Sequence, residues 1–185
     1  MKTFFSLILM FCLTPALANV VYFEPDSEIS YKGYHPAHNW IGTSTSFKGG
    51  IICKENSFED CIIKIVAPIT SFDSGNSSRD SNMLLYTKSK DFPSVIFISD
   101  KFDIVGFDKI NFEISGTLDF NGLKNKIKTN IQLFQSDESI IGKSNFKIFL
   151  DDYEVEKPQL LFIPISNEID IEANLIIKNT FLESK

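Results

Sequence analysis

Residues 111–133, NFEISGTLDFNGLKNKIKTNIQL, carry the pattern of two strands joined by a tight turn. From residue 111 to residue 121 apolar and polar side chains alternate, which is the period of a strand with one buried face. Asn121 and Gly122 then supply two residues that tolerate positive φ, as the type I′ turn of a hairpin requires. The segment therefore predicts an antiparallel β-hairpin.

The turn also predicts the register of this hairpin. It places Phe112 opposite Ile131 on the apolar face, and Asp119 opposite Lys124 on the polar face. Cross-strand pairs of this kind stabilise a sheet by roughly 0.2 to 1 kcal/mol each. A slip of one residue would turn every apolar side chain of one strand to water, so we expect one register only.

Outside the hairpin, more segments show a strand pattern, and one segment does not. Serine, asparagine and aspartate are frequent in residues 71–87, and a turn followed by a short helix capped near Ser78 or Asp80 fits them best. Residues 160–165 are apolar but lie between prolines, so they form at most an edge segment. The other predicted strands are residues 27–34, 40–53, 61–68, 95–102, 139–150 and 169–177.

Together these elements predict an all-β fold with about eight antiparallel strands and one short helix in the 71–90 region. Nearly every predicted strand has one continuously apolar face. Such strands either pack as two sheets or close into one barrel, and closure removes the exposed edges. We expect an eight-stranded antiparallel barrel.

The N-terminus has the features of a cleaved secretory signal. A basic start is followed by an apolar run and by Ala16-Leu17-Ala18, so residues 1–18 are predicted to be a signal peptide and residues 19–185 the β-barrel domain. We expect a periplasmic or secreted protein without stable membrane insertion, because no later apolar stretch is long enough to span a bilayer. A net charge of −6 with no basic stripe argues against a nucleic-acid partner. The sequence does not determine the oligomeric state, and a homodimer is one alternative.

Cys53 and Cys61 remain as a cysteine pair after the predicted signal peptide. If the strands around them form a hairpin that sets Ile51 opposite Ile63, the two cysteines also face each other at bridging distance. A structural disulfide is therefore expected in an oxidising compartment. A redox pair is the alternative, although the spacing differs from the C-x-x-C of redox motifs.

No pattern of catalytic or metal-binding residues is present. His35 and His38 are the two histidines of the chain, and Pro36 opposes the helical turn that would bring both onto one metal ion. The sequence also has no Gly-x-Ser-x-Gly elbow and no phosphate-binding glycine loop. We expect no metal site, no cofactor and no catalytic residues, and predict that the protein is not an enzyme.

Several segments in order along the chain resemble the YceI-like family of polyisoprenoid-binding proteins. ITSFDSG at 69–75, RDSNM at 79–83 and FPSVIFIS at 92–99 look like the signature of the family, and the part from Arg79-Asp80 to Phe97 is the most specific. The segments 38–51, 116–122 and 169–177 are also similar. The resemblance implies a lipocalin-like barrel in the periplasm or secreted space. Its apolar lumen would hold an isoprenoid such as a polyprenyl phosphate or a quinone.

The resemblance also assigns candidate roles to residues of this chain. Without it, the inward phenylalanines equally well form a filled core. With it, the expected lumen residues are Phe97, Phe112, Ile114, Phe120, Ile131, Leu133, Phe146, Ile148, Ile171 and Leu175. Arg79, Asp80 and Trp40 are candidate head-group contacts, since guanidinium groups suit phosphate. The alternative for Arg79 and Asp80 is an ion pair that fixes the 71–87 segment to the barrel.

Two functions from different classes follow. The first is a carrier or buffer that binds a hydrophobic small molecule, an isoprenoid lipid, in the barrel lumen. The second is a ligand-free envelope or surface interaction protein that uses the barrel as a scaffold. The second predicts a packed lumen and an exposed apolar patch elsewhere.

Overall fold

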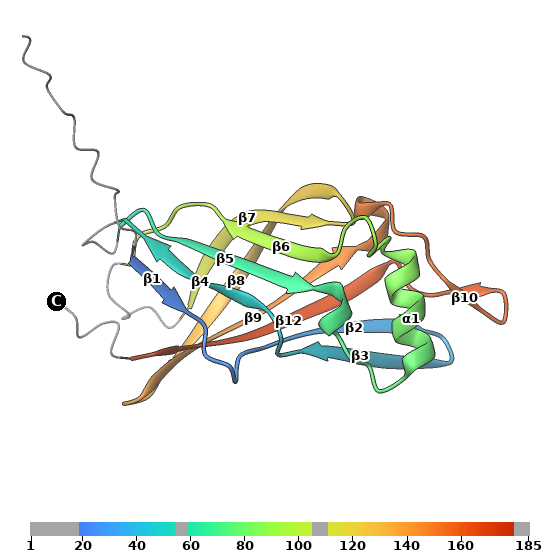
Figure 1. The fold of residues 1–185 in the computed structure, drawn as a ribbon, viewed down its shortest axis with the longest axis horizontal. Coiled ribbons are helices and arrows are strands. Elements are labelled where there is room, and N and C mark those ends of the chain that lie inside the picture. The colour runs from blue at the N-terminus through green and yellow to red at the C-terminus, as the bar shows by residue number, and fades with distance from the viewer. Residues whose placement is uncertain (1–18, 55–58, 105–110, 180–185) are drawn as a thin grey trace, which may run out of the picture.

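The computed structural model describes residues 19–54, 59–104 and 111–179, so the predicted signal peptide lies outside the described residues (Figure 1). Short 3₁₀ turns η1 (Ile69–Ser71) and η2 (Leu150–Tyr153) and one helix, α1 (Ser77–Tyr86), interrupt the strands. The strands are β1 (Asn19–Tyr22), β2 (Glu28–His35), β3 (His38–Ser44), β4 (Lys48–Cys53), β5 (Ile62–Pro68), β6 (Ser94–Ser99), β7 (Asn111–Phe120), β8 (Leu123–Gln135), β9 (Ser139–Phe149), β10 (Gln159–Leu160), β11 (Ile163–Pro164) and β12 (Glu168–Lys178). The all-β prediction with one short helix is confirmed.

The described strands form one ten-stranded antiparallel sheet in the order β1-β4-β5-β6-β7-β8-β9-β12-β2-β3, and β10 pairs separately with β11. The predicted number of eight is too low for two reasons. β1 lies next to the predicted cleavage site and was not recognised as a strand. The predicted strand 40–53 breaks after Ser44 into β3 and β4, which pair with different neighbours.

The sheet curls into a barrel-like shape, but connecting segments rather than a strand ladder join its two edges (Figure 1). At one side, Thr43 of β3 exchanges two backbone hydrogen bonds with Asp73, which follows η1, at 2.9 and 3.0 Å. At the other side, the chain after β1 forms backbone hydrogen bonds with β4 and β12. The Phe23 amide donates to the Gly49 carbonyl of β4, and the Glu24 amide donates to the Ile176 carbonyl of β12. The predicted closed ladder is thus replaced by a curled sheet with bridged edges.

The β7–β8 hairpin has the predicted register. Phe112 pairs with Ile131 and Asp119 with Lys124. Asn121 and Gly122 have φ of 52° and 79°, as a type I′ turn requires. Asn121 is buried, and its side-chain amide donates to the Tyr153 carbonyl at 2.8 Å, so this turn is also attached to η2.

The β4–β5 pair sets Ile51 opposite Ile63, as predicted, and a disulfide joins Cys53 to Cys61. Both cysteines are buried. Cys61 also exchanges backbone hydrogen bonds with Phe102, which ties the end of β5 to the segment after β6.

Helix α1 begins earlier than expected. Its N-cap is Asn76, whose side-chain oxygen accepts a hydrogen bond from the Arg79 amide at 3.0 Å, rather than Ser78 or Asp80. Asparagine is as good an N-cap as serine or aspartate, so the run of polar residues alone did not determine the first turn. Met83 and Leu84 pack on the apolar interior at one end of the sheet. None of the described helices has the length and apolarity needed to cross a bilayer.

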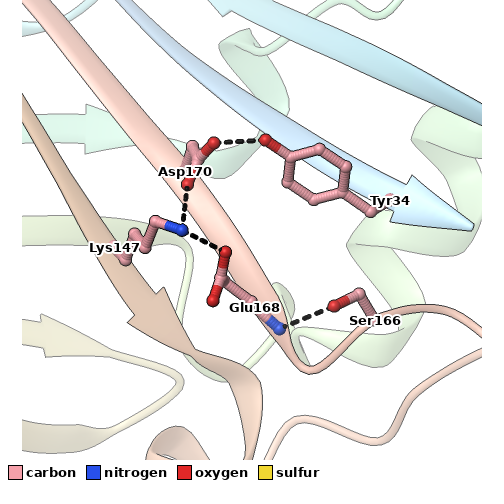
Figure 2. Close-up of polar contacts among 5 residues, drawn as sticks. All are labelled: Tyr34, Lys147, Ser166, Glu168 and Asp170. Carbon is pink, nitrogen blue, oxygen red and sulfur yellow. Dashed lines mark hydrogen bonds and ion pairs between the residues drawn. The ribbon is translucent and has the colours of Figure 1, made fainter.

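A polar network ties three neighbouring strands together on the outer face of the sheet (Figure 2). Lys147 of β9 forms ion pairs with Glu168 and Asp170 of β12, and the Tyr34 hydroxyl of β2 donates to Asp170. The hydrogen bond to Asp170 raises the pKa of Tyr34. Ion pairs at such exposed positions contribute little to stability, so this network mainly fixes the register of the strands.

Candidate ligand cavity

A cavity of about 440 Å³ lies inside the curled sheet. Its walls combine side chains from two apolar clusters, one packed against α1 and the other around Ile63, Ile114 and Ile131. Eight of the ten predicted lumen residues line it: Phe97, Ile114, Phe120, Ile131, Phe146, Ile148, Ile171 and Leu175. The interior is therefore partly hollow.

Phe112 and Leu133, the other two predicted lumen residues, lie beyond the cavity. Both point inward but pack with the second cluster, where the Phe112 ring stacks on Phe102 with centroids 6.3 Å apart. Period-two patterning identifies the inward face of a strand, but it does not say where along the strand the interior stops being hollow. Aromatic rings fill the interior at this end of the described fold.

The cavity reaches the surface beside α1, where some of its lining residues are exposed. Helix α1 lies at the end of the sheet opposite β1 (Figure 1). Five of the lining residues of the cavity are exposed, and they come from the start of β3, from α1 and its N-cap, and from β10: His38, Asn76, Asn82, Gln159 and Leu160. We call this end the mouth. Apart from Arg79 and Trp40, the head-group candidates included none of the residues at the mouth, because the short elements that carry them show no periodicity that marks which side chains face the cavity.

Arg79 carries the only formal charge of an Asp, Glu, Lys or Arg side chain among the described residues that line the cavity. Its guanidinium carbon lies 5.5 Å from the centroid of the Trp40 ring, a cation–π distance. One guanidinium nitrogen also donates to the carbonyl and hydroxyl oxygens of Ser74, at 3.3 and 3.2 Å. Two of the three head-group candidates, Arg79 and Trp40, are thus brought together at the mouth.

Asp80, the third candidate, does not line the cavity. Its carboxylate accepts hydrogen bonds from the Ser74 hydroxyl, at 2.6 Å, and from the Ser74 amide. Within the described part of the chain, no carboxylate forms an ion pair with Arg79. The Arg79–Asp80 ion pair suggested as an alternative is therefore wrong, although both side chains attach α1 to Ser74.

Two glycines leave space for aromatic rings of the mouth to pack against the sheet. Gly33 pairs with Trp40 across the β2–β3 ladder, and a Cβ at Gly33 would lie 2.2 Å from an indole carbon. Gly42 pairs in the same way with Tyr31, whose ring would lie 2.3 Å from an added Cβ. Each ring lies flat on the backbone of the partner strand because that strand has no side chain there.

Tyr31 is a neutral hydrogen-bonding group near Arg79. Burial raises its pKa, the Asp80 carboxylate adds to the increase, and Trp40 and Arg79 oppose it. The phenol thus keeps its proton throughout the physiological pH range. With Arg79, it gives the mouth polar groups that suit an anionic or carbonyl-bearing head group.

His35 connects the mouth to the β10–β11 hairpin. The ring is buried, its Nδ1 accepts from the Ala37 amide at 3.1 Å, and its Nε2 lies 3.2 Å from the Ile163 carbonyl oxygen. Since Nδ1 accepts, the proton is on Nε2, which donates to Ile163. Among the described residues, no group of three or more His, Cys, Asp or Glu side chains could hold a metal ion.

Comparisons with known proteins agree with this fold. A YceI-like domain model matches residues 23–177. The structure of a polyisoprenoid binding domain from Saccharophagus degradans implicated in plant cell wall breakdown superposes with a TM-score of 0.71 at 16% identity, over 88% of this chain and 99% of that one. Burkholderia cenocepacia BcnA gives 0.70 at 14% identity, over 83% and 98%.

A YceI protein of Campylobacter jejuni superposes with a TM-score of 0.60 at 19% identity, over 75% of this chain and 84% of that one. A search of curated protein sequences finds no match. At these identities the structural likeness shows the fold, and the domain match over most of the sequence shows the family. The chain belongs to the YceI-like family.

Proposed function

We propose that this protein is a secreted or periplasmic carrier or buffer of an isoprenoid lipid. The observation that carries the proposal is an apolar cavity of about 440 Å³ with a single cationic side chain, Arg79, at its mouth. Small-molecule sites are typically roughly 300 to 1,000 Å³ in volume and combine an apolar wall with a few placed polar groups. This cavity has both features.

Transfer of the prenyl tail out of water would supply most of the affinity. Each buried methylene contributes about 0.8 kcal/mol, so a few isoprene units in the cavity contribute several kcal/mol before the costs of association and ordering. Affinity should therefore rise with the length of the buried tail until the cavity is full.

The head group would be recognised at the mouth. A phosphate can take charge-assisted hydrogen bonds from Arg79, whereas a quinone offers only neutral carbonyl oxygens. The absence of a carboxylate partner for Arg79 among the described residues favours an anionic head group. A polyprenyl phosphate is therefore the first ligand to test, and a quinone the second.

Membership of the YceI-like family supports this proposal, as does the fold shared with the polyisoprenoid binding domain of Saccharophagus degradans. The proposed role is binding without catalysis: among the described residues that line the cavity, no hydrogen bond joins a nucleophile to a base. A ligand-free scaffold predicts a packed interior, so the cavity favours the carrier over the scaffold.

Native mass spectrometry of the purified protein, followed by lipid extraction, tests the proposal. We expect a co-purifying prenyl lipid in the wild type. Ser144→Phe adds a ring to the cavity wall and should reduce the amount of bound lipid, whereas Ser115→Phe makes the same change on the outer face of β7 and should not. Wild-type protein that carries no apolar molecule and takes up no added farnesyl phosphate would refute the carrier function.

A further inference from the structure

The β10–β11 hairpin presents a protruding apolar tip at the mouth of the cavity. Leu160 and Ile163 are 43% and 46% exposed, and between them Leu161 and Phe162 are 78% and 95% exposed. Residues 158–165, PQLLFIPI, contain no charged side chain. Contiguous exposed apolar side chains of this kind mark a surface that contacts something other than water.

The turn of this hairpin has an unfavourable sequence. Leu161 and Phe162 have φ of 53° and 67°, a region that bulky L-residues rarely adopt. The chain uses Asn121-Gly122 for the same backbone conformation in the β7–β8 hairpin, where the turn serves only the fold. Large apolar side chains at a position that favours Asn-Gly indicate that the side chains themselves have a role.

Hydrogen bonds attach the base of the hairpin beside the cavity. The Ile165 amide donates to the Pro158 carbonyl at 3.0 Å across the base of the hairpin, and His35 holds Ile163 through its carbonyl oxygen. Leu160 belongs both to the exposed tip and to the cavity wall. An apolar surface therefore continues from the outside of the hairpin into the cavity.

From these observations we propose that the β10–β11 tip inserts into the surface of a lipid bilayer and thereby opens the cavity mouth to membrane lipid. The proposal rests on the carrier function proposed above. The hairpin protrudes from the end of the fold (Figure 1), and its two most exposed side chains lie at its tip, a shape that suits insertion into a fluid apolar layer. Interfacial contacts of this kind bury apolar side chains roughly 5 to 10 Å deep.

The surrounding charges indicate the kind of bilayer. The segment that leads into the hairpin carries four exposed carboxylates, Asp151, Asp152, Glu154 and Glu156, and one lysine, Lys157, which forms an ion pair with Asp151. The chain has a net charge of −6. An anionic surface would repel these carboxylates, so the preferred surface has no net charge. Binding should then depend on apolar burial and persist at high salt.

Flotation with vesicles of pure phosphatidylcholine tests the proposal without any prenyl ligand. Leu161→Asn combined with Phe162→Gly installs the turn sequence of residues 121–122, so the hairpin keeps its backbone while the tip loses its apolar side chains. We expect the vesicle partition coefficient to fall about tenfold or more, since two large apolar groups no longer leave water. Tyr22→Ser removes a 72% exposed ring from β1, at the other end of the sheet, and should leave flotation unchanged (Figure 1).

The outcomes separate this inference from the carrier function. Wild type that fails to float, or that floats no better than the Asn-Gly variant, overturns it even if the protein binds farnesyl phosphate in vesicle-free buffer. The single change Phe162→Ser repeats the test with minimal risk to folding. A dimer in lipid-free sedimentation that the Asn-Gly variant dissociates would assign the tip to a second copy of the chain, and would also overturn the inference.

Discussion

The guanidinium carbon of Arg79 lies 5.5 Å from the centroid of the Trp40 ring, at the mouth of a largely apolar cavity. The indole limits the positions of the arginine side chain, and Ser74 fixes the guanidinium from the other side. A cation that is already oriented loses less entropy when an anion binds. If the proposed function holds, we expect Arg79 to be the residue that distinguishes charged from neutral ligands.

Replacing Arg79 by glutamine should weaken binding of farnesyl phosphate by about tenfold or more, because hydrogen bonds to charged groups contribute about 1.5 to 3 kcal/mol. Binding of farnesol, which has the same tail and no phosphate, should change little. Titration calorimetry with both ligands measures the difference. Lys90→Gln removes an exposed cation from the loop after α1 and serves as the control. An equal loss of affinity for farnesyl phosphate and farnesol would show that Arg79 affects the shape of the cavity and does not bind the head group.

Gly33→Ala should displace the Trp40 ring, since the added Cβ would lie 2.2 Å from an indole carbon. Forced overpacking of this kind costs about 1 to 3 kcal/mol of unfolding free energy. Trp40 is the single tryptophan, so its emission maximum reports the displacement directly. Gly142→Ala is the matched change in β9, where the nearest atom to a new Cβ is 3.4 Å away, and it should alter neither quantity.

Removal of the disulfide by Cys53→Ala with Cys61→Ala should lower the free energy of unfolding by about 2 to 3 kcal/mol, from the entropy of closing a short loop. Urea titrations with and without reductant measure it. Reductant should destabilise the wild type and leave the double variant unaffected. If reductant also destabilises the double variant, the stabilisation attributed to this bridge has another source.

The protein should lose stability at alkaline pH in part through Tyr153, because burial raises the pKa of this phenol from 10.0 to about 12. The neutral phenol is favoured in the folded state, so its contribution is complete below pH 10 and is lost between about pH 10 and pH 12. Urea titrations at pH 9 and pH 11 should show a smaller difference for Tyr153→Phe than for the wild type. An unchanged difference would mean that other groups account for the alkaline loss.

The regular parts of the fold could be predicted from the sequence. The β7–β8 register followed from alternation and from Asn121-Gly122, and the disulfide followed from the facing positions of Cys53 and Cys61. The register and the disulfide both follow from the alternation of apolar and polar residues along neighbouring strands, which is visible in a single sequence.

The mouth of the cavity could not be predicted in the same way. His35 ends β2, and Gln159 and Leu160 form a two-residue strand, so periodicity does not mark which of these side chains face the mouth. The break between β3 and β4 was missed because alternation continues across it, and only pairing with different neighbours separates the two strands. Contacts between residues far apart in the sequence determine both the mouth of the cavity and the break between β3 and β4.

Phenylalanine rings occupy the interior at the end of the sheet opposite α1, where Phe102 stacks on Phe112. A linear lipid would then enter and leave only at the mouth. Its hydrocarbon end would enter first and leave last. Chains longer than the available depth would leave their surplus units outside, beside Leu161 and Phe162. The distance from Arg79 to the innermost ring would therefore set the number of isoprene units that a bound lipid can place inside the cavity.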